Sequence, residues 1–307
     1  MFRILALLLL PVICLAQVNS NGEKPTGELL SNEIALNDMK RNASFNVDEI
    51  KVRWKKAALE NCAGVPCVVA PSFTCGTSTV SDYDGNVYET VSIVGTGVTQ
   101  CWTKSNLKVT RYNDGTLIPD ETNSTSNPWA TSGARTGYVD NGVTGVYVGT
   151  LGYLYNWYAV TDSRKLCPVG WHVPTDAEWT TMIQVLDPNQ VVTSANVSTF
   201  NGPQSTTAGI ALKSDVINST AGSGLGWDPY NPSSRGTNTS GFSILPGGRR
   251  RDDGSFLNIR RSSILWSATE GDVNNAWYRS LDFFLGGQVY RGIDFKSVGA
   301  SVRCLKD

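Results

Sequence analysis

Short apolar stretches that alternate with polar residues follow one another from Ser81 to the end of the chain. Such alternation is typical of strands with one buried face, and Asp-Gly or Asn-Gly pairs between the stretches favour tight hairpin turns. Pairs of this kind between the apolar stretches are Asp84-Gly85, Asp114-Gly115, Asn141-Gly142 and Asp253-Gly254. The pattern therefore predicts a series of antiparallel hairpins.

One helix is strongly indicated within this strand pattern. Thr175 and Glu178 form a T-x-x-E capping box at its start. Four apolar residues then share one helical face: Trp179, Met182, Ile183 and Leu186. We expect this helix to end near Asp187-Pro188 and a shorter helix to cover 207–214. The Gly/Ser/Asn/Pro-rich residues 216–239 are expected to form surface loops.

Residues 1–16 have the features of a secretory signal peptide. Arg3 precedes an apolar run that ends at Ala16 and is shorter than the roughly 20 residues needed to span a bilayer. We expect cleavage after Ala16. Lipid attachment at Cys14 is the alternative, which the bulky Ile13 before it disfavours. No later apolar run approaches the spanning length, so we expect an exported protein, secreted or at the cell surface, without a membrane span.

Residues 17–81 form an N-terminal region of different character. A polar leader reaches to about residue 30, and a mixed segment follows in which a helix over 47–60 is favoured over a strand. Beyond it, a proline-containing linker carries Cys62, Cys67 and Cys75. We place the main domain at residues 82–307.

The cysteine count indicates disulfides. Six of the seven cysteines remain once Cys14 leaves with the signal peptide, and an even number is typical of an exported, oxidised chain. Zinc is disfavoured, because a C-x4-C pair with one remote histidine lacks the usual ligand spacing. Cys62, Cys67, Cys75 and Cys101 allow three pairings. We favour Cys75 with Cys101, which flank the first expected hairpin, and Cys62 with Cys67, and the other pairings stay open.

Charge and histidine content disfavour several classes of function. The chain has 26 Lys/Arg and 27 Asp/Glu, with no basic run longer than Arg249 to Arg251, so it lacks the basic surface of a nucleic-acid-binding protein. The single histidine, His172, lies between Trp171 and Val173 in a segment that looks buried. We expect it to be structural rather than part of a Ser-His-Asp or Cys-His centre.

The run from Asp82 to Glu89 superficially resembles a calcium loop, with Asp82, Asp84 and Asn86 alternating. Its glycine comes two residues early, and Ile93 stands where the last ligand, a glutamate, is required. The sequence therefore favours a hairpin turn here, and we expect neither a metal site nor a cofactor in this protein.

Several segments, taken together and in order, resemble one known family. They are SDYDGNVYETVSI, QCWTKSNLKVTRYNDGTLIPD, LGYLYNWYAV, KLCPVGWHVPTDAEW, SGFSILPGGRRRDDGSF, LWSATE, NAWYRSL and SVRCLKD. This set is similar to the Fibrobacter succinogenes major paralogous domain, a family of exported bacterial modules. The resemblance covers residues 82–307 and leaves the N-terminal region outside.

That family is in turn distantly similar to formylglycine-generating enzymes and C-type lectin-like folds. WHVPTDAEW resembles the R-L-P-T-E-A-E-W helix start of the former, and SVRCLKD resembles their G-F-R-C ending. The resemblance implies an α+β fold with short antiparallel sheets, one or two helices, long loops and pairing of terminal strands. It also implies a disulfide between Cys167 and Cys304.

The chemistry of those relatives is not expected here. Formylglycine-generating enzymes hold copper with two closely spaced cysteines after a Gly-Gly strand, and thiolates select Cu(I). Here Gly247-Gly248 is followed by three arginines, and no cysteine lies between Cys167 and Cys304. The calcium-binding triplets of sugar-binding lectins are absent as well. We therefore expect no catalytic residues.

Two sets of residues are candidates for ligand binding. Trp227, with Tyr230 three residues on, stands in loop sequence where an exposed indole could stack on a sugar, and Trp129 has similar surroundings. Arg249 and Arg251 could bind an acidic glycan. Ion pairs of these arginines with Asp252, Asp253 and Glu270 are the favoured structural alternative.

The sequence favours a secreted, non-catalytic binding or adhesion module for a carbohydrate or a cell-surface partner. Two alternatives stay open. A structural cell-surface protein would bind no small ligand, and a divergent hydrolase would place facing carboxylates in a cleft.

Overall fold

The computed structural model describes residues 73–121, 129, 131–140, 143–144, 147–193, 195–216, 225–227 and 235–307. The chain divides into two units, Met1–Phe73 and Thr74–Asp307, and the elements below belong to the second. The expected signal peptide, leader, helix over 47–60 and Cys62–Cys67 disulfide lie outside the described residues.

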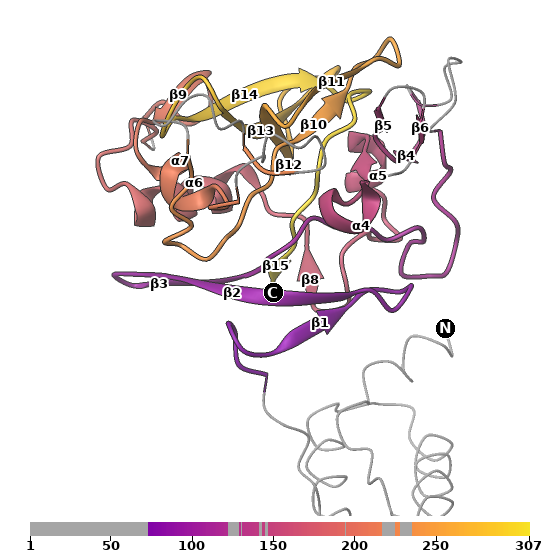
Figure 1. Cartoon of the computed structure of the whole chain (residues 1–307), viewed down its shortest axis with the longest axis horizontal. Coiled ribbons are helices and arrows are strands. Elements are labelled where there is room, and N and C mark those ends of the chain that lie inside the picture. The colour runs from indigo at the N-terminus through magenta and orange to yellow at the C-terminus, as the bar shows by residue number, and fades with distance from the viewer. Residues whose placement is uncertain are drawn as a thin grey trace, which may run out of the picture. The chain divides into compact units, whose positions relative to one another are not determined.

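One sheet combines strands from both ends of the second unit (Figure 1). Its order is β1 (Thr79–Ser81), β2 (Val87–Gly95), β3 (Val98–Thr103), β15 (Leu305–Lys306) and β8 (Trp171–His172), and all neighbours are antiparallel. The Asp84-Gly85 turn joins β1 to β2, as the sequence predicts. Gly85 has a φ of 81°, a conformation that glycine adopts without steric cost.

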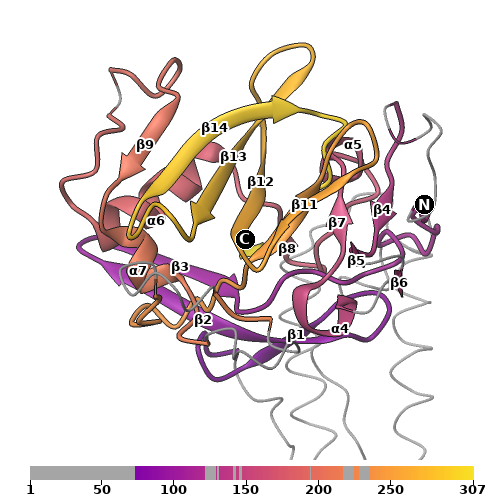
Figure 2. The ribbon, with the colours of Figure 1, turned by 45° about the horizontal axis from the view of Figure 1, so that its top comes forward.

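A second, curled sheet is built from the C-terminal part of the chain (Figure 2). Its order is β11 (Phe256–Ile259), β10 (Gly247–Arg250), β12 (Ser262–Glu270), β13 (Asn275–Asp282), β14 (Val289–Phe295) and β9 (Gly202–Ser205). Its neighbouring strands are antiparallel except β10 with β12. The expected Asp253-Gly254 turn joins β10 to β11.

Two short antiparallel pairs complete the described strands. They are β4 (Arg135–Thr136) with β7 (Leu154–Tyr155), and β5 (Val139–Asp140) with β6 (Val143–Thr144). The second pair flanks the expected Asn141-Gly142 turn, whose two residues lie outside the described part. The Asp114-Gly115 turn is formed too, with the Gly115 N–H donating to the Tyr112 carbonyl at 2.9 Å.

The described residues form four helices: α4 (Val148–Leu151), α5 (Trp157–Val160), α6 (Asp176–Leu186) and α7 (Ala208–Leu212). The expected capping box starts α6, because the Thr175 N–H donates to Glu178 Oε2 at 2.7 Å and the Glu178 N–H donates to Thr175 Oγ1 at 3.2 Å. The short helix α7 falls within the expected 207–214. No helix of the described part is long and apolar enough to cross a membrane.

Helix α6 packs against both sheets, contacting β2 and β3 of one and β12 and β13 of the other (Figure 1). Its Trp179 ring lies 4.7 Å, centroid to centroid, from Trp102 of β3, and both are buried in one cluster with Phe242 and Leu265. Aromatic pairs at this separation stabilise a core beyond the area that they bury. The architecture is thus α+β, as the sequence predicts.

A buried ion triad joins the start of α6 to the second sheet. Arg279 of β13 and Arg291 of β14 are register partners, and each binds a different carboxylate oxygen of Asp176 at 2.7 Å. All three side chains are at most 5 % exposed. Burial acts to raise the pKa of Asp176, but the hydrogen bonds and charges of the two guanidinium groups lower it below its usual value. Burial lowers the pKa of Arg279 to about 10.

Two disulfides staple the described unit. Cys167 pairs with Cys304 across a sequence separation of 137, and Cys75 pairs with Cys101 across 26. Both pairings confirm the expectations from the sequence. The first ties the segment before β8 to the segment before β15, and these two strands are hydrogen-bonded neighbours.

We predict that Asp176→Asn lowers the free energy of unfolding by about 3–5 kcal/mol, because it leaves two buried guanidinium groups without a counter-charge. The matched control is Asp162→Asn, which breaks a more exposed pair with Arg164 and should cost at most about 1 kcal/mol. Urea denaturation measures both. Equal costs would show that the triad is not a special determinant of stability.

We also predict that the two disulfides contribute unequally. Replacing Cys167 and Cys304 together by alanine should cost about 5 kcal/mol, against about 3.5 kcal/mol for Cys75 and Cys101, since the longer loop restricts the unfolded chain more. Denaturation of the two double variants tests the order, which a larger cost for the shorter loop would contradict.

Candidate functional site

The tryptophans expected in exposed loops are buried, which corrects the sequence-based expectation. Trp227 is 0 % exposed, its Nε1 donates to the Ile244 carbonyl at 2.9 Å, and Lys213 Nζ lies 4.6 Å from its ring centroid. Trp129 is 1 % exposed and donates to the Ser297 carbonyl. The polar sequence around these tryptophans was a poor guide to their exposure. Each indole donates a hydrogen bond to a backbone carbonyl and packs against a cationic side chain, and these partners come from other parts of the chain. A ring so buried cannot stack on a sugar, and Tyr230 lies outside the described residues.

The candidate arginines form ion pairs within the protein, which is the structural role that the sequence favoured over ligand binding. Arg249 pairs with Asp294 at 2.6 Å, and Arg251 pairs with Asp253 at 3.8 Å. Glu270, which we expected beside these arginines, pairs instead with Lys296. The structure therefore does not bring Arg249 and Arg251 together around an open cavity with the tryptophan.

His172 is one-third exposed rather than buried, and carboxylates flank both of its ring nitrogens. Nδ1 lies 2.6 Å from Asp307 Oδ1, and Nε2 lies 3.0 Å from Glu178 Oε1. Burial acts to raise the pKa of Glu178, but hydrogen bonds from Thr175 and His172 lower it below its usual value. The arrangement connects β8 to α6 and agrees with a structural role.

An open groove of the described unit begins at the turn between β1 and β2. Asp82 organises this turn, because its Oδ1 accepts the backbone N–H groups of Asp84 and Asn86 at 3.0 Å and its Oδ2 accepts the Tyr88 hydroxyl at 2.6 Å. These are the contacts of a turn-stabilising aspartate, as the sequence predicts. Within the described residues, no cluster of three or more metal-binding side chains occurs.

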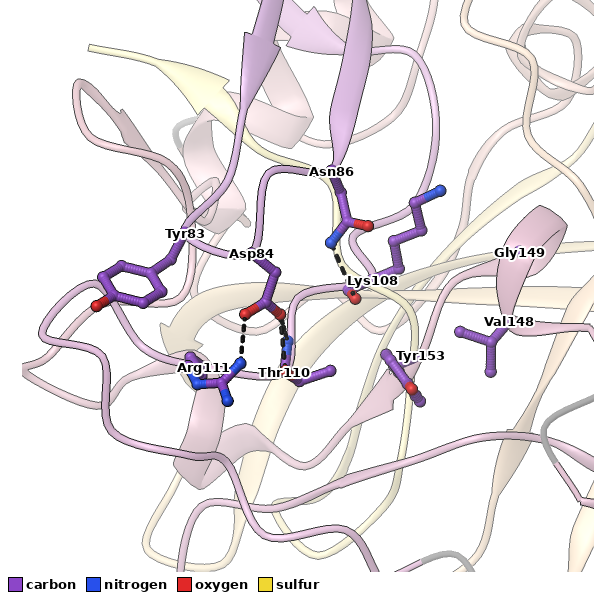
Figure 3. A pocket seen from close by; sticks show the side chains of 9 residues that line it. All are labelled: Tyr83, Asp84, Asn86, Lys108, Thr110, Arg111, Val148, Gly149 and Tyr153. Carbon is purple, nitrogen blue, oxygen red and sulfur yellow. Dashed lines mark hydrogen bonds and ion pairs between the residues drawn. The ribbon is translucent and has the colours of Figure 1, made fainter.

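Asp84 joins this turn to the next segment of the chain. Its Oδ2 accepts the Thr110 N–H at 2.5 Å and the Thr110 hydroxyl at 2.7 Å, and its Oδ1 pairs with Arg111 at 3.1 Å (Figure 3). Partial burial acts to raise the pKa of Asp84, but these hydrogen bonds and the Arg111 charge lower it below its usual value. The carboxylate is therefore ionised at neutral pH, and the positive charge of Arg111 already balances its negative charge.

The groove has a volume of about 680 Å³ and combines aromatic, cationic and small side chains. Its lining residues are Tyr83, Asp84, Asn86, Lys108, Thr110, Arg111, Val148, Gly149 and Tyr153 (Figure 3). They come from the first turn, from the segment after β3, and from α4 with the residues that follow it. Aromatic faces beside hydrogen-bonding side chains are suited to a polar ligand that also has an apolar face.

Two features keep this groove accessible. Tyr83 is 52 % exposed, and a Cβ added at Gly149 would meet no atom within 4 Å. One face of the Tyr153 ring is covered by Arg135, whose guanidinium carbon lies 4.3 Å from the ring centroid. Seven of the nine lining residues lie within the family-like segments SDYDGNVYETVSI, QCWTKSNLKVTRYNDGTLIPD and LGYLYNWYAV, whereas Val148 and Gly149 lie outside them, and no local signal joined Asp84 to Tyr153.

We predict that Trp227→Ala and Trp179→Ala lower the free energy of unfolding by similar amounts, about 3–5 kcal/mol each, because both indoles are fully buried and hydrogen-bonded. A loop tryptophan would instead leave stability nearly unchanged. Urea denaturation of the two variants side by side distinguishes these cases.

Comparison with known proteins identifies the family. The sequence profile of the Fibrobacter succinogenes major domain matches residues 97–306. No curated protein and no solved structure gives a significant match to this chain. The matched residues include the second sheet, strands β3, β8 and β15 of the first sheet, α6, the Cys167–Cys304 disulfide and the groove residues from Lys108 to Tyr153, whereas β1, β2 and the turn between them precede the matched range. The chain therefore belongs to the Fibrobacter succinogenes major domain family.

Proposed function

We propose that this protein is an extracytoplasmic, non-catalytic binding module that holds a carbohydrate in the groove between the first turn and α4. The observation that carries the proposal is the groove itself, where the exposed Tyr83 and the partly buried Tyr153 accompany the polar groups of Asn86, Thr110 and Arg111. Sugars present an apolar ring face and many hydroxyls, which match aromatic rings and hydrogen-bonding side chains. The two disulfides support an extracytoplasmic location.

A lectin-like arrangement is part of the same proposal. It is supported by the capped helix α6 between the two sheets, by the pairing of the last strand β15 with β3 and β8, and by the Cys167–Cys304 disulfide. A rigid frame of this kind holds loop residues in place, which lowers the entropy lost on binding.

Binding without catalysis is favoured by the state of the carboxylates. Glycoside hydrolysis uses a carboxyl group with a raised pKa as general acid. Every described carboxylate with a shifted pKa has it lowered; these groups are Asp84, Asp114, Asp162, Asp176, Glu178, Asp187, Asp253 and Asp272. These groups are ionised at neutral pH and are therefore poor proton donors.

We predict that the purified full chain binds specific oligosaccharides on a glycan array and that Gly149→Leu weakens this binding by about tenfold or more, since the added side chain fills the groove. The matched control is Thr150→Leu, at the next exposed position of α4 and outside the groove lining, which should bind as the unmodified chain does.

Three other results would contradict the proposal. Binding that is unaffected by Gly149→Leu would place the ligand elsewhere. A chain that binds no glycan would favour a structural cell-surface protein. Release of reducing sugar from a bound glycan would show a hydrolase.

A further inference from the structure

We propose that the groove selects an anionic sugar, one that carries a carboxylate such as a uronic acid, and that Lys108 pairs with that carboxylate. This inference rests on the proposed function and names the ligand class of the same site. It depends on three observations: the fixed position of Lys108, the absence of an acidic partner for it, and the charge of the surrounding groove.

The backbone of Lys108 is held on both sides of its side chain. Its N–H donates to the Tyr88 hydroxyl at 3.0 Å, and its carbonyl accepts from Asn86 Nδ2 at 3.4 Å. Tyr88 is itself fixed by Asp82 beneath the turn. The starting point of the lysine side chain is therefore set by the turn that forms one wall of the groove.

The Lys108 ammonium makes no ion pair with any described carboxylate. The contrast with other described lysines is clear, because Lys104 pairs with Glu89 at 3.0 Å and Lys296 pairs with Glu270. In Figure 3 the Lys108 side chain extends away from Asp84. An ammonium group donates three hydrogen bonds, so this one is available to a ligand.

The groove lining carries more positive than negative charge. Asp84 is its one acidic residue, and Thr110 and Arg111 already occupy that carboxylate. The neighbouring Asp82 is buried behind the turn and accepts hydrogen bonds from Asp84, Asn86 and Tyr88. Among the lining residues, Lys108 is therefore the one charged side chain without an oppositely charged partner, which favours an anion and disfavours a cation at this point of the groove.

The surroundings of this charge indicate a sugar acid rather than a free small anion. Tyr83 and Tyr153 contribute aromatic rings to the lining, and Gly149 leaves open space where another residue would place a side chain. Arg111 uses Nη1 for Asp84, so its other N–H groups are free to reach sugar hydroxyls. A small inorganic anion would leave these surfaces uncovered.

The test compares an oligogalacturonate with its methyl ester, which keeps the sugar rings but removes the charge, by isothermal titration calorimetry on the full chain. We expect the acid to bind about tenfold more tightly than the ester, the effect of one charge-assisted hydrogen bond. Lys108→Gln should abolish this preference while leaving ester binding unchanged. Lys104→Gln, a lysine outside the groove lining, should keep it, and added salt should reduce it.

Each other outcome is decisive. Equal binding of acid and ester, both lost in Gly149→Leu, would overturn selection by charge and leave the proposed function standing. A preference that survives Lys108→Gln would overturn the role of this lysine. Tighter binding of a sulfated oligosaccharide than of the oligogalacturonate would assign the anion to a sulfate. Binding of no oligosaccharide on the calorimeter or the array would overturn both proposals.

Discussion

The layered arrangement depends on one interaction, the ion triad that the buried carboxylate of Asp176 forms with two arginines of the second sheet. Strands β13 and β14 place Arg279 and Arg291 opposite one another inside the protein, where two like charges would be strongly unfavourable alone. Asp176 stands in the first turn of α6, where the helix dipole favours a negative charge, and binds both guanidinium groups. The helix therefore has one place and one orientation on the second sheet that satisfy all three charges, and its opposite side then packs on β2 and β3.

Cations also determine how this protein buries its tryptophans. A Lys or Arg side chain lies over each of four indole rings, in the pairs Lys213 with Trp227, Arg250 with Trp129, Lys296 with Trp157 and Arg291 with Trp277. Each pairing lets a ring face and an alkyl stem share one desolvated surface, and the cation gains the attraction of the ring quadrupole. Burial lowers the pKa of Lys213 to about 8, which reflects how little water reaches this site. A loop tryptophan in such a pair belongs to the core.

The same frame holds the groove in a fixed shape. The Cys75–Cys101 disulfide joins the segment before β1 to β3, and Asp82 and Asp84 fasten the turn after β1 to Tyr88 and to the segment around Thr110. Binding to a site of this kind requires little reordering of the chain, so the free energy of contact with a ligand is not spent on ordering loops.

The sequence by itself determined the features that depend on near neighbours in the chain or on a shared motif order. The capping box at Thr175, the turns at Asp84-Gly85 and Asp253-Gly254, the α+β class and the family could all be read from it, and resemblance implied the Cys167–Cys304 pair. Only the tertiary structure decided that Trp129 and Trp227 are buried and where the groove lies. The burial of Trp227 is set by Lys213 and the Ile244 carbonyl, and the groove arises where residues 83–86, 108–111 and 148–153 meet. Exposure is a property of the three-dimensional neighbours of a side chain, and those neighbours come from parts of the sequence that no local pattern connects.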